Sequence, residues 1–374
     1  MKKSIKANAA QARTAAKVKQ QKVDWKRVTT VGIDLGDRFS HFCALDADGT
    51  VIAEGRVATT PAAMELEFKP ASPKRIAIEA GMHSPWLSRL LKRLGHEVLV
   101  ANPRKLRLIY ENQRKSDRVD AEYLARVARL DPKLLCALEH RSESGQCHLA
   151  IIRARDTLVR SRGRLIQHIR SAIKSIGERV PSGTAECFHK RAAACLPDGL
   201  REALLPLIEM VEQLTTRIRE FDRKVQQLAE DRYPDTEALT QVCGVGSLTA
   251  LAYILTLEDE GRFRHSRSVG AWLGLVPGQH DSGENQPQWH ITKEGDPYLR
   301  RLLVGSAQYI LGPFAKDCDL RRYGLAIAAR GGANAKKRAV VAVARKLAVL
   351  LHCLWRTREV YEPFFNSREQ HAAA

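Results

Sequence analysis

Four carboxylates in the first third of the chain could together hold divalent metal ions: Asp34, Glu79, Asp117 and Asp120. Asp34 and Glu79 each end a short apolar run, VGID and RIAIE, and each is therefore expected at the end of a β-strand. Asp117 and Asp120 are three residues apart in SDRVDAEYLA, which places them on one face of a helix. Like charges so close repel unless a cation or proton neutralises them. Two Mg²⁺ ions about 4 Å apart, bridged by such carboxylates, assist phosphoryl transfer, so the pattern predicts phosphodiester chemistry.

Basic residues lie immediately before and among the helical acids. The candidates for nucleic-acid contacts here are Arg104, Lys105, Arg114, Lys115 and Arg118. A basic rim beside an acidic centre suits a polyanionic substrate, because the rim binds phosphates while metal ions neutralise the carboxylates. The alternative is that the two helical acids are surface residues paired with these cations. The acids at the strand ends favour the metal site.

The second half of the chain carries further candidates. Gly244 and Gly246 lie between two helical patterns, where their backbone N–H groups would bind a phosphate at a helix N-terminus or simply form a tight interhelical turn. The polar loop 279–289 contains Ser282, and on composition alone such a serine is a turn former. Candidate nucleic-acid contacts after this loop are Lys293, Arg300 and Arg301.

The elements that must position the acids form an α/β layer. Three strand-like runs begin at Val28, with Asp48-Gly49 as a hairpin signal between the second and third. A short helix near residues 61–68, the strand RIAIEA, an amphipathic helix closed by Gly95 and the strand EVLVANP follow. Three antiparallel strands followed by alternating helices and strands predict a mixed sheet. The RNase H-like fold has that order.

The centre of the chain is helical. Residues 141–177 are expected to form one long basic helix, and residues 202–230 a second with apolar residues spaced by three and four. That apolar row consists of Leu204, Leu207, Val211, Leu214, Ile218, Phe221, Val225 and Leu228. Such a row is typical of a coiled coil, formed with the preceding helix or with a second chain. We expect self-association through it.

The composition favours a nucleic-acid partner. The 374 residues include 61 Lys and Arg against 42 Asp and Glu, a net charge of +19. No apolar run has the length of a membrane span or a secretion signal, so no membrane partner and a cytoplasmic location are expected. The eight cysteines have no metal-ligand spacing, and most are expected to be small apolar fillers in the reduced state.

The acids, the heptads and three later segments together resemble one family. The segments are GVGSLTA, FRHSRSVGAWLGLVPGQHDSG and HITKEGDPYLRRLL, and in this order they resemble the transposases of the IS one-ten insertion-sequence family, including its IS-eleven-eleven branch, from about Val28 to Leu311. The resemblance implies a RuvC-like domain with a DEDD metal site formed by the four acids, and a C-terminal transposase domain with Ser282 as nucleophile. It also implies a covalent phosphoserine link to DNA and a bridge RNA that pairs with donor and target DNA. The KEGD stretch at 293–296 departs from the family's KRGN-like pattern, which puts phosphate contacts beyond Lys293 in doubt.

The expected organisation is therefore an α/β RNase H-like (RuvC-like) N-terminal domain, a central helical coiled coil and a mainly α-helical C-terminal transposase domain. The ranges are a basic disordered arm at 1–27, the RuvC-like catalytic domain at 28–140, the coiled-coil region at 141–235, the transposase domain at 236–330, and a C-terminal helix and tail at 331–374. The last helix either closes the domain's core or lies along a nucleic acid.

The predicted function is strand cleavage and exchange between donor and target DNA by an insertion-sequence transposase. Mg²⁺ at a two-metal site, replaceable by Mn²⁺, would assist Ser282, a bridge (guide) RNA would direct the enzyme, and the enzyme would be a homo-oligomer, dimer or tetramer, joined by the coiled coil. If Ser282 is inert, the same acids suit a RuvC-type structure-specific DNA endonuclease. An actin-like sugar kinase also begins with GIDLG, but the phosphate and adenosine loops it needs are absent from the sequence. A non-catalytic derivative of a transposase would be expected to have lost some of the acids.

Overall fold

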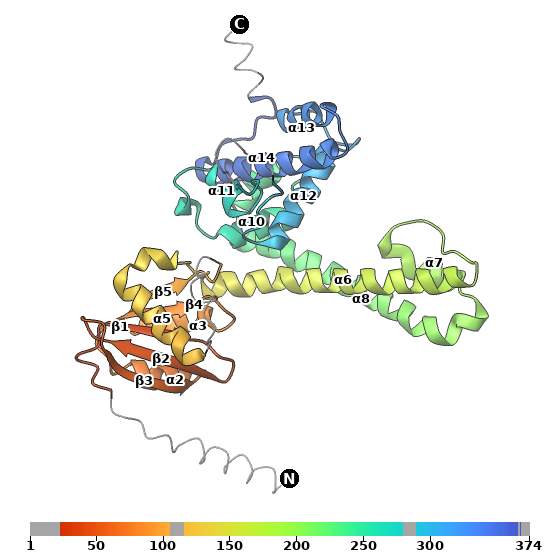
Figure 1. Ribbon diagram of the computed structural model, residues 1–374. Helices are drawn as coiled ribbons and strands as arrows, with labels where there is room; N and C mark the ends of the chain where they lie inside the picture. The colour runs from red at the N-terminus through yellow and green to blue at the C-terminus, as the bar shows by residue number, and fades with distance from the viewer. Residues whose placement is uncertain (1–22, 105–115, 280–288, 366, 368–374) are drawn as a thin grey trace. The chain divides into compact units, whose positions relative to one another are not determined.

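The computed structural model describes residues 23–104, 116–279, 289–365 and 367 (Figure 1). The chain divides into two compact units, Met1–Glu143 and Ser144–Ala374. The first contains the sheet and the second consists of helices. The basic arm expected at 1–27 lies mostly outside the described residues.

A five-stranded mixed sheet forms the centre of the first unit, in the order β3-β2-β1-β4-β5 (Figure 1). Its strands are β1 (Thr30–Asp34), β2 (Phe39–Leu45), β3 (Val51–Ala58), β4 (Arg75–Glu79) and β5 (Glu97–Ala101). The first three strands pair antiparallel, and β4 and β5 are parallel to β1 and to each other. The turn between β2 and β3 contains Gly49 at a positive φ of 87°, as its hairpin signal predicted. The predicted mixed sheet is confirmed.

The two faces of this sheet are covered by different helices. Residues alternate along a strand, so Ile76 and Ile78 point to one face and pack with α2 (Pro61–Phe68) and α3 (Ser84–Arg93). Ala77 points to the other face and packs against α5 (Asp117–Leu130). A short 3₁₀ helix, η1 (Pro132–Leu135), follows α5. The small residues on the second face allow α5 to lie close to the strands.

Two long helices lie side by side in the second unit: α6 (Glu143–Ser175) and α8 (Asp198–Arg232) (Figure 1). Isoleucines of α6 pack with apolar residues of α8 and with α7 (Phe188–Ala194) in one cluster. The 3₁₀ helix η2 (Ala185–Cys187) leads into α7. In the middle of the pair, Arg155 binds Asp222 and Arg162 donates to the Thr215 hydroxyl. The helix at 202–230 therefore packs against the preceding helix of its own chain.

The remaining helices surround one large core. They are α9 (Thr236–Thr240), α10 (Ser247–Leu257), η3 (Glu260–Arg262), α11 (Ser268–Trp272), α12 (Pro297–Leu311), α13 (Asp319–Ala329) and α14 (Ala335–Thr357). Tyr253 of α10 is fully buried in this core and its hydroxyl donates to the Ala348 carbonyl at 2.6 Å. Because Leu347 and Leu351 belong to the same core, α14 closes the domain, which was one of the two expectations for it.

One expectation about side chains is wrong. Of the eight cysteines, all of them free, only Cys43 and Cys318 are buried, and four are exposed. Most are therefore not core fillers, because the positions that they occupy in helices and loops do not face the cores. Within the described residues, no helix combines the length and the apolar character that crossing a bilayer requires.

Candidate active site

Asp34 and Glu79 end neighbouring parallel strands. The last paired residues of β1 and β4 are Ile33 and Ile78. Each acid is the next residue of its strand, so both lie at the same edge of the sheet. Adjacent strands lie about 4.8 Å apart, which makes the two acids neighbours across the sheet. Both residues are half-buried. The sequence pattern correctly placed each acid at a strand end.

The helix α5 approaches this edge without intervening side chains. Gly32 lies two residues before Asp34, on the same face of β1. A Cβ atom at Gly32 would lie 2.1 Å from the Ala121 carbonyl oxygen and 2.4 Å from the Ala125 nitrogen. The backbone of α5 therefore rests directly on β1, and the glycine permits that contact. The first turn of the helix, with its acids, is fixed beside the end of the strand.

Asp117 and Asp120 form that first turn. The Ser116 hydroxyl caps the helix by accepting a hydrogen bond from the Val119 N–H at 3.4 Å. Carboxylates are favoured here by the positive end of the helix dipole. Asp120 is buried, with 8% of its surface exposed, whereas the Asp117 side chain is 63% exposed. The two helical acids thus differ in environment although they share a face.

His41 lies beside one of the four acids and His83 beside a further acid, Asp37, and neither histidine was predicted from the sequence. His41 of β2 is the cross-strand partner of Asp34, and its Nδ1 lies 3.4 Å from an Asp117 carboxylate oxygen. His83 lies before α3, with its Nε2 3.7 Å from a carboxylate oxygen of Asp37. No sequence motif marks either histidine, because their position depends on the register of β2 against β1 and on the path of the chain after β4.

The donor chemistry of the four acids fits a hard divalent cation such as Mg²⁺ or Mn²⁺, which prefers carboxylate oxygens. Within the described part of the chain, however, no three His, Cys, Asp or Glu side chains are grouped closely enough to form a ready-made metal site. A bound ion would therefore have to draw the carboxylates of Asp34, Glu79, Asp117 and Asp120 together. The backbone positions permit this, since all four belong to one end of β1, β4 and α5.

The basic rim is described only in part. Arg118 binds the Glu54 carboxylate of β3 at 2.6 Å, and this hydrogen bond raises the pKa of Arg118. Arg118 thereby joins the start of α5 to the sheet. Arg104 is exposed just after β5, where its N–H donates to the Asn102 side chain at 3.1 Å. Lys105, Arg114 and Lys115 lie outside the described residues, and the nucleic-acid contacts of this rim stay predictions.

Ser282 also lies outside the described residues, but both ends of its segment are described. Pro277 and Ile291 form an antiparallel bridge. The Gly278 N–H donates to the His290 carbonyl, and the Thr292 N–H to the Val276 carbonyl, each at 2.9 Å. The described residues on the two sides of this segment thus form one short two-stranded stem.

The KEGD stretch after this stem is fixed by several contacts. Gly295 has φ 72°, and a Cβ there would lie 2.3 Å from the Trp272 carbonyl oxygen, so the loop lies against the end of α11. One carboxylate oxygen of Asp296 caps α12 by accepting from the Tyr298 and Leu299 N–H groups at 2.8 Å, and the other binds Arg153 of α6. An asparagine could provide the cap but not the ion pair. Lys293 remains exposed.

The two arginines of α12 have partners within the protein. Arg300 donates to the Leu273 carbonyl at 2.9 Å. Arg301 binds Asp156 of α6 at 2.6 Å and stacks on the Tyr298 ring, whose centroid is also 4.5 Å from the Arg153 guanidinium. These contacts hold α12 against α6 and the preceding loop. Binding of nucleic acid by either arginine stays a prediction.

The glycines before α10 have different surroundings. Gly244, at φ 84°, would place a Cβ 3.1 Å from both the Ser306 carbonyl oxygen and the Tyr309 ring of α12. This position favours the tight interhelical turn over a ligand site. Gly246 is exposed at the N-cap of α10. A Cβ atom added there would have no heavy atom within 4 Å. This glycine leaves room for an anion at the N-terminus of the helix.

Comparison with known proteins places both units in one family. Residues 31–177 match the DEDD transposase model of IS110-type elements, and residues 236–317 match the model described as "Transposase IS116/IS110/IS902 family". The first match covers the sheet, α5 and α6. The second covers α9 to α12 and the stem around Ser282.

Whole-chain relatives agree with these matches. The transposase for insertion sequence element IS1328 of Yersinia enterocolitica is 30% identical over 287 residues, which is 75% of this chain and 83% of that protein. A probable family 20 transposase of Pseudomonas aeruginosa is 28% identical, over 90% of this chain and 99% of the relative. The transposase for element IS1111A of Coxiella burnetii is 26% identical, over 92% and 94%. The chain therefore belongs to the IS116/IS110/IS902 family of insertion-sequence transposases.

Proposed function

We propose that this transposase exchanges DNA strands through a covalent link to Ser282, assisted by divalent metal ions at Asp34, Glu79, Asp117 and Asp120. The observation that carries the proposal is the position of all four acids at one end of β1, β4 and α5. The strand order of the sheet supports assigning the first unit to the RNase H-like, RuvC-like fold. Membership of a transposase family excludes the sugar-kinase alternative.

The proposed step is an exchange at phosphorus. The Ser282 Oγ attacks a DNA phosphodiester, an Oγ–P bond forms, and the bond to the leaving sugar oxygen breaks as that oxygen gains a proton. The hydroxyl of a second strand later attacks the phosphoserine, so one phosphodiester forms for each one broken. When bound, the metal ions would neutralise phosphate charge and favour loss of the serine proton. The exchange needs no external energy source, because the phosphoserine is itself a phosphodiester and preserves the bond energy of the broken DNA linkage.

The partners follow from the same proposal. Donor and target DNA are the substrates, a bridge RNA guides their pairing, and the enzyme works as a homo-oligomer joined through the helical arm of α6 and α8. The net charge of +19 supports binding of more than one nucleic-acid strand. The exposed Arg104 and Lys293 and the open N-terminus at Gly246 are the described candidates for phosphate contacts.

The test is formation of a covalent adduct. Purified protein is incubated with Mg²⁺, end-labelled DNA carrying the element's junction and RNA transcribed from the element's flanks, and labelled DNA is followed on a denaturing protein gel. We expect an adduct that protease destroys. Ser282→Ala should abolish it, whereas Ser182→Ala, which changes an exposed serine of the same unit, should not. An adduct that persists in Ser282→Ala would overturn the assigned nucleophile.

The metal site is tested separately with conservative variants. Asp34→Asn and Glu79→Gln remove charge with little change in shape and should each lower adduct formation by about 10²-fold or more, as should removal of metal with EDTA. Normal recombination by Asp34→Asn would contradict the metal site. Cut DNA with free ends and no adduct in the native protein would instead favour the endonuclease alternative.

RNA guidance has its own measurement. RNA that co-purifies with the protein is sequenced, and a transcript from beside its own gene is the expected result. Only unrelated cellular RNA, together with unchanged recombination after ribonuclease treatment, would contradict a guide.

A further inference from the structure

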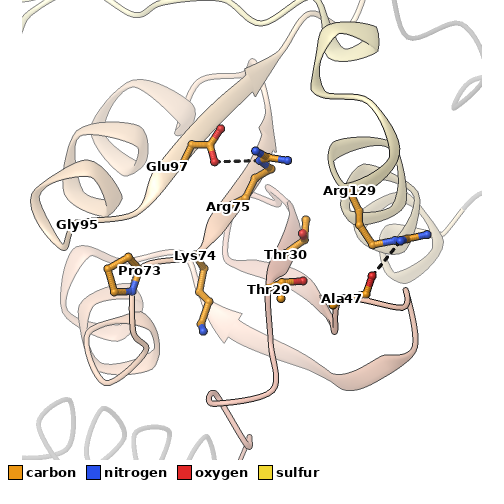
Figure 2. A pocket seen from close by; sticks show the side chains of 9 residues that line it. All are labelled: Thr29, Thr30, Ala47, Pro73, Lys74, Arg75, Gly95, Glu97 and Arg129. Carbon is orange, nitrogen blue, oxygen red and sulfur yellow. Dashed lines mark hydrogen bonds and ion pairs between the residues drawn. The ribbon is translucent and has the colours of Figure 1, made fainter.

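A pocket of about 480 Å³ lies in the first unit, at the edge of the sheet opposite the acids (Figure 2). Thr30, Arg75 and Glu97 line it, and these residues begin β1, β4 and β5. Asp34 and Glu79 end the first two of these strands. At about 3.3 Å per residue, the two sites are roughly 13 Å apart along the sheet.

The lining of this pocket carries excess positive charge. Its charged residues are Lys74, Arg75, Arg129 and the single acid Glu97. Arg75 Nε donates to the Glu97 carboxylate at 2.9 Å, so these two charges neutralise each other (Figure 2). The charges of Lys74 and Arg129 remain. Both side chains border the same space, with Thr29 and Thr30 between them (Figure 2).

Lys74 is the feature that points to a ligand. It is only 9% exposed, yet its ammonium has no hydrogen bond or ion pair to any residue that the structure describes. Its backbone is fixed just before β4, because its N–H donates to Nδ1 of the buried His96 at 3.2 Å. The ammonium lines the pocket, and an anion there would supply the partner that the described residues do not.

Arg129 supplies the second charge from α5. Its Nη1 donates to the Ala47 carbonyl at 3.1 Å, which fixes the guanidinium beside the pocket (Figure 2). Its Nε is buried next to Gly49 and has no partner among the described residues. The guanidinium is therefore positioned by the protein and only partly satisfied by it.

We propose that this pocket binds a phosphate group carried on a nucleotide. Two uncompensated cations select an anion, and the lining contains threonine hydroxyls but no aromatic side chain on which a base could stack. The volume exceeds that of a lone phosphate and suits a nucleotide-sized group. The phosphate belongs either to a nucleic-acid strand or to a free nucleotide. The strand as source rests on the proposed function, and it would give the domain a second anchor remote from the acids.

The test compares Lys74→Met with Lys69→Met in the full chain. Methionine keeps the apolar stem of the buried lysine, and Lys69 is a control because its side chain is 68% exposed and does not line the pocket. Binding of a fluorescein-labelled single-stranded oligonucleotide is measured by anisotropy over a range of salt concentrations. Lys74→Met should weaken binding about fivefold and reduce the salt slope by about one, whereas Lys69→Met should change neither. Lys74→Arg, which keeps the charge, should restore binding.

Free adenosine monophosphate separates the two sources. If it raises the melting temperature of the native protein but not of Lys74→Met, and oligonucleotide binding does not depend on Lys74, the phosphate site holds and its source is a free nucleotide. Equal binding of both probes by native protein and a folded Lys74→Met variant overturns the proposal. Adduct formation is measured independently, so a failure of this pocket and a failure of the Ser282 mechanism are distinguishable.

Discussion

Gly32 controls how the acids are assembled. Its missing side chain lets α5 rest on β1, and the helix in turn places Asp120 beside the end of that strand. Both atoms that a Cβ would meet belong to the helix backbone, so no side-chain rotation can relieve the overlap. A residue without a side chain thus determines how closely the helix that begins with Asp117 approaches the strand that ends with Asp34.

Gly32→Ala should therefore cost stability and activity together. We expect a loss of about 1–3 kcal/mol in the free energy of unfolding, measured by urea titration, and a large loss of adduct formation as α5 shifts. Gly81→Ala is the matched control, because a Cβ there meets no heavy atom within 4 Å and its φ is not positive. It should change stability by less than about 0.5 kcal/mol. Equal stability of the two variants would contradict the close contact.

His96 should make the first unit sensitive to acid. Burial lowers the pKa of its imidazole below the usual value of about 6.5, while Nε2 donates to the Phe68 carbonyl and Nδ1 accepts from Lys74. The unfolded chain then binds the proton at a higher pH than the folded chain does. The stability that neutral His96 contributes is fully present above about pH 6.5. It falls as the pH drops below that value and stops falling below the pKa of the folded state.

His96→Gln tests this directly, because glutamine can accept from Lys74 and donate to Phe68 without titrating. Between pH 7.5 and 5.5 the melting temperature should fall less for this variant than for the native protein. His168→Gln, at an exposed position of α6, should follow the native curve. Parallel curves for His96→Gln and the native protein would show that His96 is not the group responsible.

The functional residues that only the structure revealed could not be predicted from the sequence, and the physical reason is the same for each. The acids were predictable because each ends or begins an element that its own sequence marks. His41 depends on the register of β2 against β1, and Lys74 and Arg129 meet across the start of a sheet although they are 55 positions apart in the sequence. Local periodicity contains no information about such meetings.

At the scale of elements, the contact between α6 and α8 is partly polar. The buried residues of α8 are Leu204, Ile208, Val211, Thr215, Ile218, Val225 and Ala229. These residues are spaced alternately by four and three positions. The only position of the series that is not occupied by a buried residue is Asp222. Thr215 and Asp222 face Arg162 and Arg155, which are also seven residues apart. The residue numbers of the two partners add up to the same value in both pairs. This is the relation expected of two antiparallel helices in a fixed register.

This polar centre accompanies a difference in burial along the predicted apolar row. Leu204, Val211, Ile218 and Val225 are buried as expected, but Leu207, Leu214, Phe221 and Leu228 are only half-buried. Counting apolar residues alone favoured Leu214 and Phe221 over the polar Thr215 and Asp222. The arginines of α6 reverse that preference, because they bind a hydroxyl and a carboxylate. Sequence periodicity predicted the position of the helix correctly. The buried face that it predicted is rotated about the helix axis from the observed one.

The pair Arg155–Asp222 should therefore specify the register of the two helices. Asp222→Leu leaves the half-buried Arg155 without its acid and should cost about 1 kcal/mol in urea unfolding. The exchange Arg155→Asp with Asp222→Arg should recover most of that loss. Asp198→Leu, at an acid whose side chain is 96% exposed, is the control and should have little effect. An exchanged pair no more stable than the single variant would argue against a register role.

At the scale of the whole molecule, the proposed chemistry is divided between the two units. The four acids lie in Met1–Glu143 and Ser282 lies in Ser144–Ala374. The first unit has its own buried clusters on both faces of the sheet, and the second has a core around α10 and α14. Each unit can therefore be expected to fold alone, whereas the adduct should need both.

Separate fragments 23–143 and 144–374 test this division. Mg²⁺ or Mn²⁺ should raise the melting temperature of the first fragment, and Asp34→Asn with Glu79→Gln should remove that effect, since a ligand that binds only the folded state stabilises it. The second fragment should show no such shift and should form no adduct alone, because its serine lacks the acids. Adding the first fragment at high concentration should restore some adduct. An adduct from residues 144–374 alone, at the rate of the full chain, would mean that the acids of the sheet do not assist Ser282.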